Sequence, residues 1–237
     1  MSSLLEVRGL NAWYGAAQVL LDVDLQVQRG EVVGLMGRNG AGKSSTLKAI
    51  MGLMPRRSGA IRFAGIDISQ ARTHEVARLG LGFVPENRRI FSELTVLENL
   101  EVGRQPPRHW PDGTPAPLWS PEQLFQVFPN LASMLDRLGS HMSGGEQQML
   151  AVARTLMGNP LLVLLDEPTE GMAPLIVAQM ARMIQALKSQ GVSILLSEQN
   201  EQFAATVCDR VYLIDQGLVQ PAAHGRMNAI AARTDPT

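Results

Sequence analysis

One short segment carries the residues with the clearest chemistry. Residues 37–44 read Gly-Arg-Asn-Gly-Ala-Gly-Lys-Ser and follow the pattern G-x-x-x-x-G-K-S/T between an apolar run and a helical pattern. Glycines at this spacing let backbone N–H groups surround a phosphate, and the next helix start adds a positive dipole. The Lys43 ammonium can reach the β- and γ-phosphates, and the Ser44 hydroxyl can bind Mg²⁺. The residues predicted to contact the nucleotide here are Gly37, Arg38, Asn39, Gly40, Ala41, Gly42, Lys43, Ser44 and Ser45.

A second segment ends in two carboxylates. The apolar run 161–165 is followed directly by Asp166 and Glu167. In open parallel sheets, ligands bind at the carboxyl ends of the strands. We therefore expect Asp166 to hold the Mg²⁺ and Glu167 to act as the general base that polarises an attacking water. Alone, this pattern is also typical of an ordinary solvated turn, but together with the phosphate loop it predicts one magnesium–nucleotide site.

A third segment resembles a second phosphate site. Ser143 is followed by Gly144 and Gly145 and then by a helical pattern, so Ser143 can cap the helix while the glycines expose backbone N–H groups. An ordinary helix cap has the same residues, and both interpretations stay open on the residues alone. Two phosphate-binding helix starts in one chain are explained if two chains enclose the nucleotide between them.

The pattern of apolar residues predicts the elements that position these segments. Apolar residues alternate with period two over 4–7 and 19–27, which favours strands. Four runs have the composition of strands buried on both faces: 31–36, 81–84, 161–165 and 192–196. Helical patterns occupy 43–51, 74–79, 173–190 and 201–207, and a short one begins at about His224. Buried strands that alternate with helices predict an α/β protein with a mostly parallel sheet covered on both faces.

One segment is unusually rich in proline. Six of the 14 prolines and two of the three tryptophans, Trp110 and Trp119, lie between Pro106 and Pro121. Proline at this density excludes the interior of a regular helix or sheet, so we expect a loop. The interpretation we favour is a solvated spacer, and the alternative is a partner contact made by the tryptophans.

Composition limits the class of protein. The chain has 237 residues, 45% of them hydrophobic, which is enough for a sizeable core. With 21 Lys and Arg against 22 Asp and Glu, its net charge of −1 argues against a protein that coats nucleic acid. The single cysteine excludes an internal disulfide framework and suits a reducing compartment. We found no membrane-spanning run and no secretory signal, so we expect a cytoplasmic chain.

The phosphate loop, the Ser-Gly-Gly-Glu-Gln run at 143–147 and the Leu-Leu-Asp-Glu-Pro run at 164–168 occur together in this order. This order resembles the ATP-binding subunit of an ABC transporter, over nearly the whole chain. The resemblance implies a P-loop NTPase fold: a RecA-like mixed sheet core over about 1–90 and 158–237, an antiparallel β subdomain, and an inserted α-helical signature subdomain over about 91–157. It also implies ATP and Mg²⁺ as cofactors and a head-to-tail dimer, with a sister ATPase subunit or a second copy, bound to two transmembrane permease subunits.

The resemblance assigns roles to three further residues. Tyr14, which precedes Gly15, matches the aromatic residue that stacks on adenine, although a tyrosine on a sheet surface would look the same. Glu86 stands where the family usually has a glutamine that contacts Mg²⁺ or water. A carboxylate here can itself bind Mg²⁺, so Glu86 joins Ser44 and Asp166 as a predicted metal ligand. Gln199 stands where the family usually has a histidine that contacts the γ-phosphate. An amide can still donate to phosphate oxygen but cannot become cationic. Both departures are compatible with neutral drift or with one specialised site in a heterodimeric pair.

These departures narrow the resemblance to one branch of the family. Segments 84–91, 94–100, 170–174 and 197–200 are similar to the second ATP-binding subunit of high-affinity branched-chain amino acid importers. That branch implies a subunit on the cytoplasmic face of the inner membrane, held there by its permeases and served by a periplasmic or surface binding protein. The alternatives are an importer of urea or amides, and a non-transport ABC ATPase that acts on nucleic acid or ribosomes. The near-neutral charge and the lack of coiled-coil heptads disfavour the last class.

Overall fold

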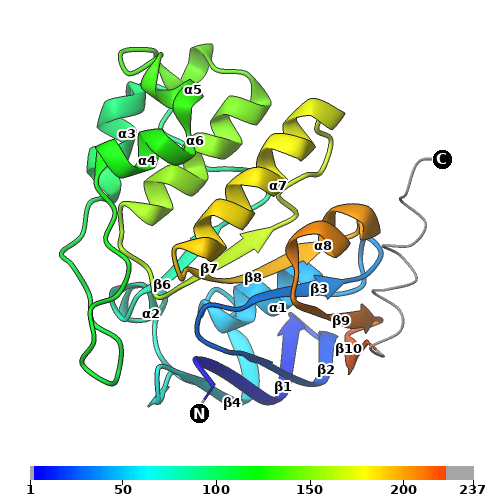
Figure 1. Cartoon of the computed structure of the whole chain (residues 1–237). Helices are drawn as coiled ribbons and strands as arrows, with labels where there is room; N and C mark the ends of the chain where they lie inside the picture. The colour runs from blue at the N-terminus through cyan, green and yellow to red at the C-terminus, as the bar shows by residue number, and fades with distance from the viewer. Residues whose placement is uncertain (1–2, 223–237) are drawn as a thin grey trace.

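The computed structural model describes residues 3–222, so the helix predicted from about His224 lies outside the described part. Its larger sheet has the strand order β10-β9-β3-β8-β7-β6, and only β10 pairs antiparallel (Figure 1). Its strands are β10 (Leu218–Pro221), β9 (Arg210–Asp215), β3 (Val32–Met36), β8 (Ser193–Glu198), β7 (Leu162–Asp166) and β6 (Leu81–Val84). Every residue of β3, β7 and β8 is buried. The prediction of a mostly parallel, doubly covered sheet is therefore confirmed.

The smaller sheet is antiparallel throughout and has the order β2-β1-β4-β5. Its strands are β2 (Ala17–Val27), β1 (Leu5–Tyr14), β4 (Arg56–Phe63) and β5 (Ile66–Asp67). Strand β1 extends well beyond the period-two run at 4–7, and its register with β2 shifts on both sides of Leu10, after Gly9 at φ +56°. The shift moves the buried positions from Leu5 and Val7 to Leu10 and Ala12, which hides the strand from a period-two pattern.

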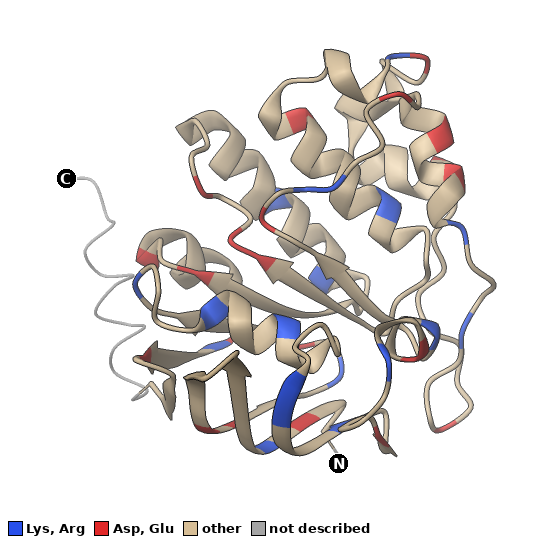
Figure 2. Ribbon diagram, turned by 180° about the vertical axis from the view of Figure 1, so that it is seen from behind, with Lys and Arg blue, Asp and Glu red and all other residues tan. Residues whose placement is uncertain are grey.

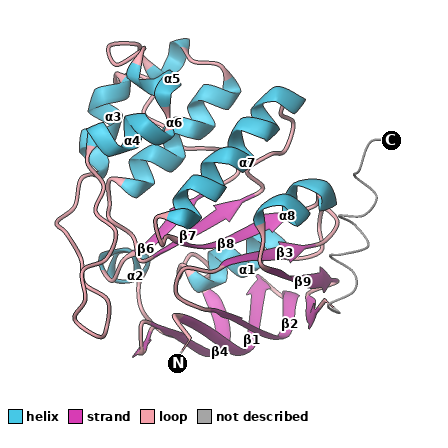
Figure 3. Cartoon of the chain, viewed as in Figure 1, coloured by secondary structure: helices cyan, strands magenta, loops and turns pink. Residues whose placement is uncertain are grey.

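Helices cover the sheets and also gather at one end of the molecule. Helix α1 (Lys43–Ile50) lies between the two sheets (Figure 1). The other helices are α2 (Thr73–Arg78), α3 (Val96–Gly103), α4 (Pro121–Val127), α5 (Pro129–Ala132), α6 (Gly144–Leu156), α7 (Pro174–Ser189) and α8 (Glu201–Val207). Figure 3 shows α3 to α6 as a group apart from the strands. None of the helices within residues 3–222 combines the length and the hydropathy that a membrane-spanning segment requires.

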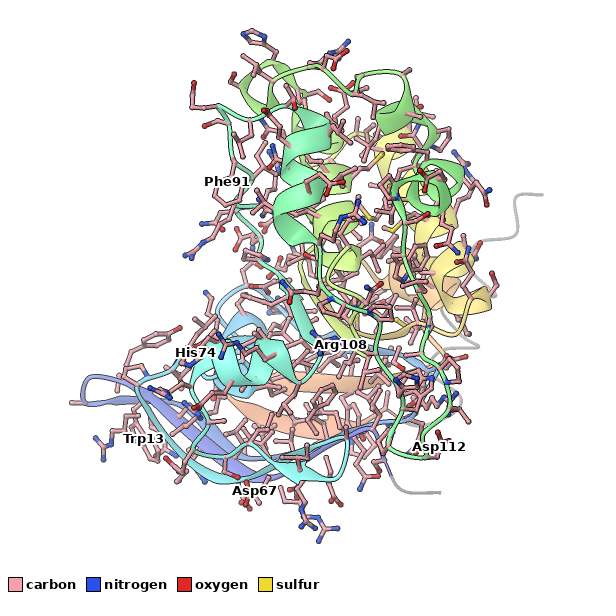
Figure 4. All side chains as sticks on the ribbon, turned by 90° about the vertical axis from the view of Figure 1, so that its left-hand side faces the viewer. Trp13, Asp67, His74, Phe91, Arg108 and Asp112 are labelled. Carbon is pink, nitrogen blue, oxygen red and sulfur yellow. The ribbon has the colours of Figure 1, made fainter. Side chains whose placement is uncertain are left out.

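The proline-rich segment is a loop, as predicted, but its tryptophans are not solvated. Trp110 and Trp119 are only 4% and 3% exposed. Trp110 packs with the core around the small sheet, whereas Trp119 packs with the core of the helices. The guanidinium of Arg29 lies over the Trp110 ring, 4.2 Å from its centre, and pairs with Asp112 at 3.0 Å. Figure 4 shows Asp112 at the end of the loop far from the helical group. Most of the other residues of 106–121 are exposed, in agreement with the spacer interpretation, whereas a partner contact through the tryptophans is contradicted because both are buried in the chain's own cores.

We expect Trp110→Ala to destabilise the fold strongly, because truncating a buried tryptophan typically costs about 3–5 kcal/mol. The matched control is Leu118→Ala in the same loop, since Leu118 is 50% exposed. Its cost should stay within about 0.5 kcal/mol, as for most surface substitutions. Urea unfolding of the two variants measures the difference. Equally small losses in both would contradict the packed arrangement of this loop.

Candidate functional site

The predicted site residues from different parts of the chain meet at one edge of the large sheet. Strands β3, β6, β7 and β8 are mutually parallel, so their carboxyl ends lie at the same edge. The phosphate loop follows β3, Glu86 follows β6, and Gln199 follows β8, while Asp166 ends β7 and Glu167 comes next. Figure 2 shows acidic positions at the ends of adjacent strands here. The parallel topology explains why residues more than 100 positions apart share one site.

The phosphate loop has the backbone that a phosphate requires. Gly40 and Gly42 adopt φ values of +79° and +113°, in the left-handed region that glycine tolerates best. Gly42 is also the residue before helix α1, where it offers no side-chain cap to the first N–H groups. A Cβ atom on Gly37 would lie 2.4 Å from the carbonyl oxygen of Ile214. A side chain therefore does not fit at Gly37, and Gly40 and Gly42 give the loop its turn, while the helix-start N–H groups are left for an anion.

Lys43 is buried at the centre of this loop. Its Nζ donates to the carbonyl oxygens of Gly37 and Arg38 at 2.7 and 3.0 Å. The same ammonium lies 3.2 Å from Oε1 of Glu167. The side chains of Lys43 and Glu167 are 2% and 8% exposed, so this pair is screened little by solvent. The positive charge of the loop is thus held beside the predicted catalytic base.

Glu167 has the environment of a basic carboxylate. Burial raises its pKa above the usual range, and the adjacent Lys43 ammonium only partly opposes this shift. Its Oε1 faces Lys43, whereas its buried Oε2 has no hydrogen-bond partner within residues 3–222. The backbone of Glu167 has φ +46°, an uncommon value for a non-glycine residue that is typical of functional sites. The unpaired oxygen can accept a hydrogen bond from water.

Ser44 and Asp166 meet at the same place although 122 residues separate them. The Ser44 hydroxyl donates to Oδ1 of Asp166 at 2.7 Å. A hydroxyl and a carboxylate oxygen are ligands that suit Mg²⁺, which usually keeps several waters and takes few protein ligands. This donor set fits the predicted metal position. Glu86 does not join it, because its exposed side chain makes no hydrogen bond or ion pair with residues 3–222.

Ser197 is a site residue that sequence reasoning missed. Its hydroxyl donates to Oδ1 of Asp166 at 2.8 Å and accepts from the backbone N–H of Glu167 at 3.0 Å. Ser197 is completely buried near the end of β8. It therefore orients the predicted metal ligand and the predicted base together. A hydroxyl at the end of the apolar run 192–196 was the only signal, and its partners lie about 30 positions away in the chain.

Within one chain, the second predicted anion site, at residues 143–145, lies away from the phosphate loop. Ser143 accepts from the N–H of Glu146 at 3.3 Å and donates its own N–H to Glu146 at 2.7 Å, so it caps α6. Helices α6 and α1 lie on opposite sides of the large sheet (Figure 1). Within residues 3–222, no hydrogen bond joins 143–145 to the phosphate loop. Arg88, another residue that we did not predict, packs its guanidinium 3.0 Å from where a Cβ on Gly144 would lie.

The remaining predicted residues surround the site less tightly. Tyr14 is 48% exposed at the end of β1 and lines a groove of about 1090 Å³ together with Glu86 and Asp166. Gln199 is exposed after β8. The side chains of Tyr14 and Gln199 make no hydrogen bond among residues 3–222. Tyr14 shares its groove with Asp166, whereas Gln199 does not line that groove, and no side-chain hydrogen bond fixes either residue within residues 3–222.

Comparison with known proteins gives a consistent result. The family model described as ABC transporter matches residues 20–170, which is more than half of the chain. The chain is 39% identical over 210 residues to the high-affinity branched-chain amino acid transport ATP-binding protein BraG of Pseudomonas aeruginosa, covering 89% of this chain and 88% of BraG. It is 35% identical over 223 residues to the lipopolysaccharide export system ATP-binding protein LptB of Escherichia coli K12, covering 93% and 90%.

A solved structure shares the whole architecture. The ATP-binding subunit of an ABC transporter superposes with a TM-score of 0.77 at 30% identity, covering 98% of this chain and 95% of that chain. This likeness, with the two sheets and the helical group described above, confirms the predicted fold class: a mixed α/β core with an antiparallel β part and a helical part.

Proposed function

Because the chain belongs to the ABC transporter family, as an ATP-binding and ATP-hydrolysing subunit, we propose that it powers the import of branched-chain or related amino acids. The observation that supports this substrate class is the 39% identity to BraG across 89% of the chain. The lipopolysaccharide export proteins are nearly as similar, which makes export of a lipid-linked substrate the second candidate. Import of urea or amides is a third.

We propose that each site residue has one role in binding or hydrolysing MgATP, assigned from its contacts in the structure. The phosphate loop holds the phosphates, Ser44 and Asp166 hold Mg²⁺, and Glu167 polarises the attacking water. When bound, the metal neutralises phosphate charge and orients the leaving group. Residues with less fixed positions take supporting roles: Tyr14 at adenine, Glu86 at the metal or its water, and Gln199 at the γ-phosphate.

The ion pair between Lys43 and Glu167 supports a simple order of events. In this structure the ammonium of Lys43 is shared between loop carbonyls and Glu167. When Lys43 turns its charge to a bound phosphate, Glu167 loses part of its counter-charge but stays buried. Burial then raises the pKa of Glu167 without the opposing effect of the Lys43 charge. The carboxylate therefore accepts a proton from water more readily.

The separation of Ser143–Gly145 from the phosphate loop supports a dimer. We propose that two subunits associate head to tail, so that α6 of each completes the other's nucleotide site. The second subunit is a sister ATPase or a second copy of this chain. The exposed apolar side chains of Leu53, Phe91 and Val102 line the same groove as Glu86, which suits docking of a permease. Two permeases would then hold the subunit at the cytoplasmic face of the inner membrane, with a binding protein acting indirectly and no role for nucleic acid.

Reconstitution with its membrane partners tests the substrate class. The full chain is co-purified in detergent with its permeases, and the complex is placed in vesicles that contain MgATP on the ATPase side. We expect ATP-dependent uptake of radiolabelled leucine, isoleucine or valine in the presence of the binding protein. Uptake of urea alone, transfer of lipopolysaccharide, or recovery of the chain with nucleic acid in place of permeases would each contradict the proposal. The Lys43→Ala complex is the control for transport without hydrolysis.

A further inference from the structure

A buried carboxylate next to Gln199 has no place in the roles above. Glu198 is the last residue of β8 and is 2% exposed. No cation balances it within residues 3–222; four donors fill its two oxygens instead. Its Oε1 accepts from the hydroxyl and the N–H of Thr169, at 2.5 and 3.1 Å. Its Oε2 accepts from the N–H groups of Gln199 and Asn200, at 3.0 and 3.1 Å.

The four donors come from two different loops. Thr169 lies two residues after Glu167, in the loop between β7 and α7. Gln199 and Asn200 form the turn between β8 and α8, where Asn200 also caps α8 through the N–H of Phe203 at 3.0 Å. One carboxylate therefore holds the loop behind the catalytic base and the turn that carries Gln199. A carboxylate that accepts several N–H and O–H donors is a strong, directional anchor.

We infer that Glu198, with Thr169, is a positioning residue that fixes Gln199 relative to Glu167. The inference rests on the proposed role of Gln199. The exposed side chain of Gln199 makes no hydrogen bond among residues 3–222. The position of Gln199 therefore depends on its backbone, whose N–H donates to the Glu198 carboxylate. Glu198 is buried and points its oxygens at these loops, so it acts through Gln199 and Glu167 rather than on the nucleotide.

The first experiment removes one hydroxyl from the anchor. Thr169→Val keeps the shape of the side chain but leaves Glu198 Oε1 with a single donor, whereas Thr169→Ser keeps the hydroxyl. We expect Thr169→Val to lower kcat for ATP roughly tenfold, with the Kd for MgATP unchanged, and Thr169→Ser to restore kcat. The matched control is Thr206→Val on α8, whose hydroxyl donates, among the described residues, only to the Gln202 carbonyl of its own helix. Equal kcat in Thr169→Val and Thr206→Val would overturn the inference.

The second experiment observes the anchor without nucleotide. Glu198→Gln replaces one of the two carboxylate oxygens by an NH₂ group. The four donors that two oxygens accept in the wild type are then left with a single acceptor oxygen. Backbone amide exchange of the nucleotide-free full chain should accelerate at Thr169, Gln199 and Asn200, but not at the N–H of Leu164 in the neighbouring buried strand β7. Unchanged exchange at all three amides would show that the carboxylate does not hold the loops.

A double-mutant cycle tests whether the anchor acts through Gln199. In a chain that already carries Gln199→Ala, we expect Thr169→Val to cause little further loss of kcat. If Gln199→Ala slows hydrolysis and Thr169→Val adds its full independent loss, the inference about Glu198 is wrong while the role of Gln199 stands. If Gln199→Ala leaves hydrolysis unchanged, the proposed role of Gln199 fails, and the inference that rests on it fails too.

Discussion

Glu167→Gln should bind MgATP as the wild type does and hydrolyse it about 10²–10⁴-fold more slowly, which is the usual contribution of a general base. The glutamine keeps the shape of the side chain and can still accept from Lys43, but it cannot take a proton from water. The phosphate loop, Ser44 and Asp166 are untouched, so affinity for the nucleotide should persist. Single-turnover hydrolysis and equilibrium binding measure the two quantities separately.

The control for this prediction is Glu122→Gln, which makes the same change at an exposed position in the first turn of α4. Its turnover should equal that of the wild type. Because burial raises the pKa of Glu167, the carboxylate is more basic than a solvated one, which suits the role of base. If Glu167→Gln hydrolysed ATP at the wild-type single-turnover rate, Glu167 would not be the general base. Its carboxylate would then have an electrostatic role only.

Ser143→Arg should stop hydrolysis by the dimer without weakening ATP binding to the monomer. Arginine removes the cap that Ser143 provides and fills the space at the start of α6. Since this helix start lies on the far side of the large sheet from α1, the substitution should damage the site of the opposite subunit (Figure 1). The matched control is Ser120→Arg, because Ser120 caps α4 with the same reciprocal arrangement, its partner being Gln123.

Mixing two inactive variants makes the test of the dimer sharper. In a head-to-tail dimer, a Lys43→Ala chain paired with a Ser143→Arg chain contains one site in which both contributing segments are wild type. We expect mixed preparations to regain hydrolysis that neither variant shows alone. A single chain that carries both substitutions, mixed with itself, should regain none. If Ser143→Arg instead abolishes ATP binding to the isolated monomer, the two anion sites belong to one chain and the dimer proposal is wrong.

Much of the site could be predicted from local sequence, for a physical reason. A phosphate loop needs glycines at fixed spacing beside a helix start, and a strand that ends in Asp166 and Glu167 shows its buried length in its apolar run. Both signals lie within a few neighbouring residues. Tyr14, Glu86 and Gln199 were found only by resemblance, and the fold leaves their side chains exposed, so their roles stay predictions.

Other features of the site and the core became visible only in the fold, because they depend on contacts between distant segments. Ser197 and Glu198 end an apolar strand, and nothing near them in the chain shows that their partners are Asp166, Glu167 and Thr169 across the sheet. Trp110 lies in a proline-rich loop, where composition predicts exposure, yet it is buried because Arg29 and the small sheet lie beside it. Local sequence was enough to predict which groups bind and hydrolyse a nucleotide. Strand order determined which of them meet, because side-chain pairing across parallel strands depends on neighbours in space rather than in the chain.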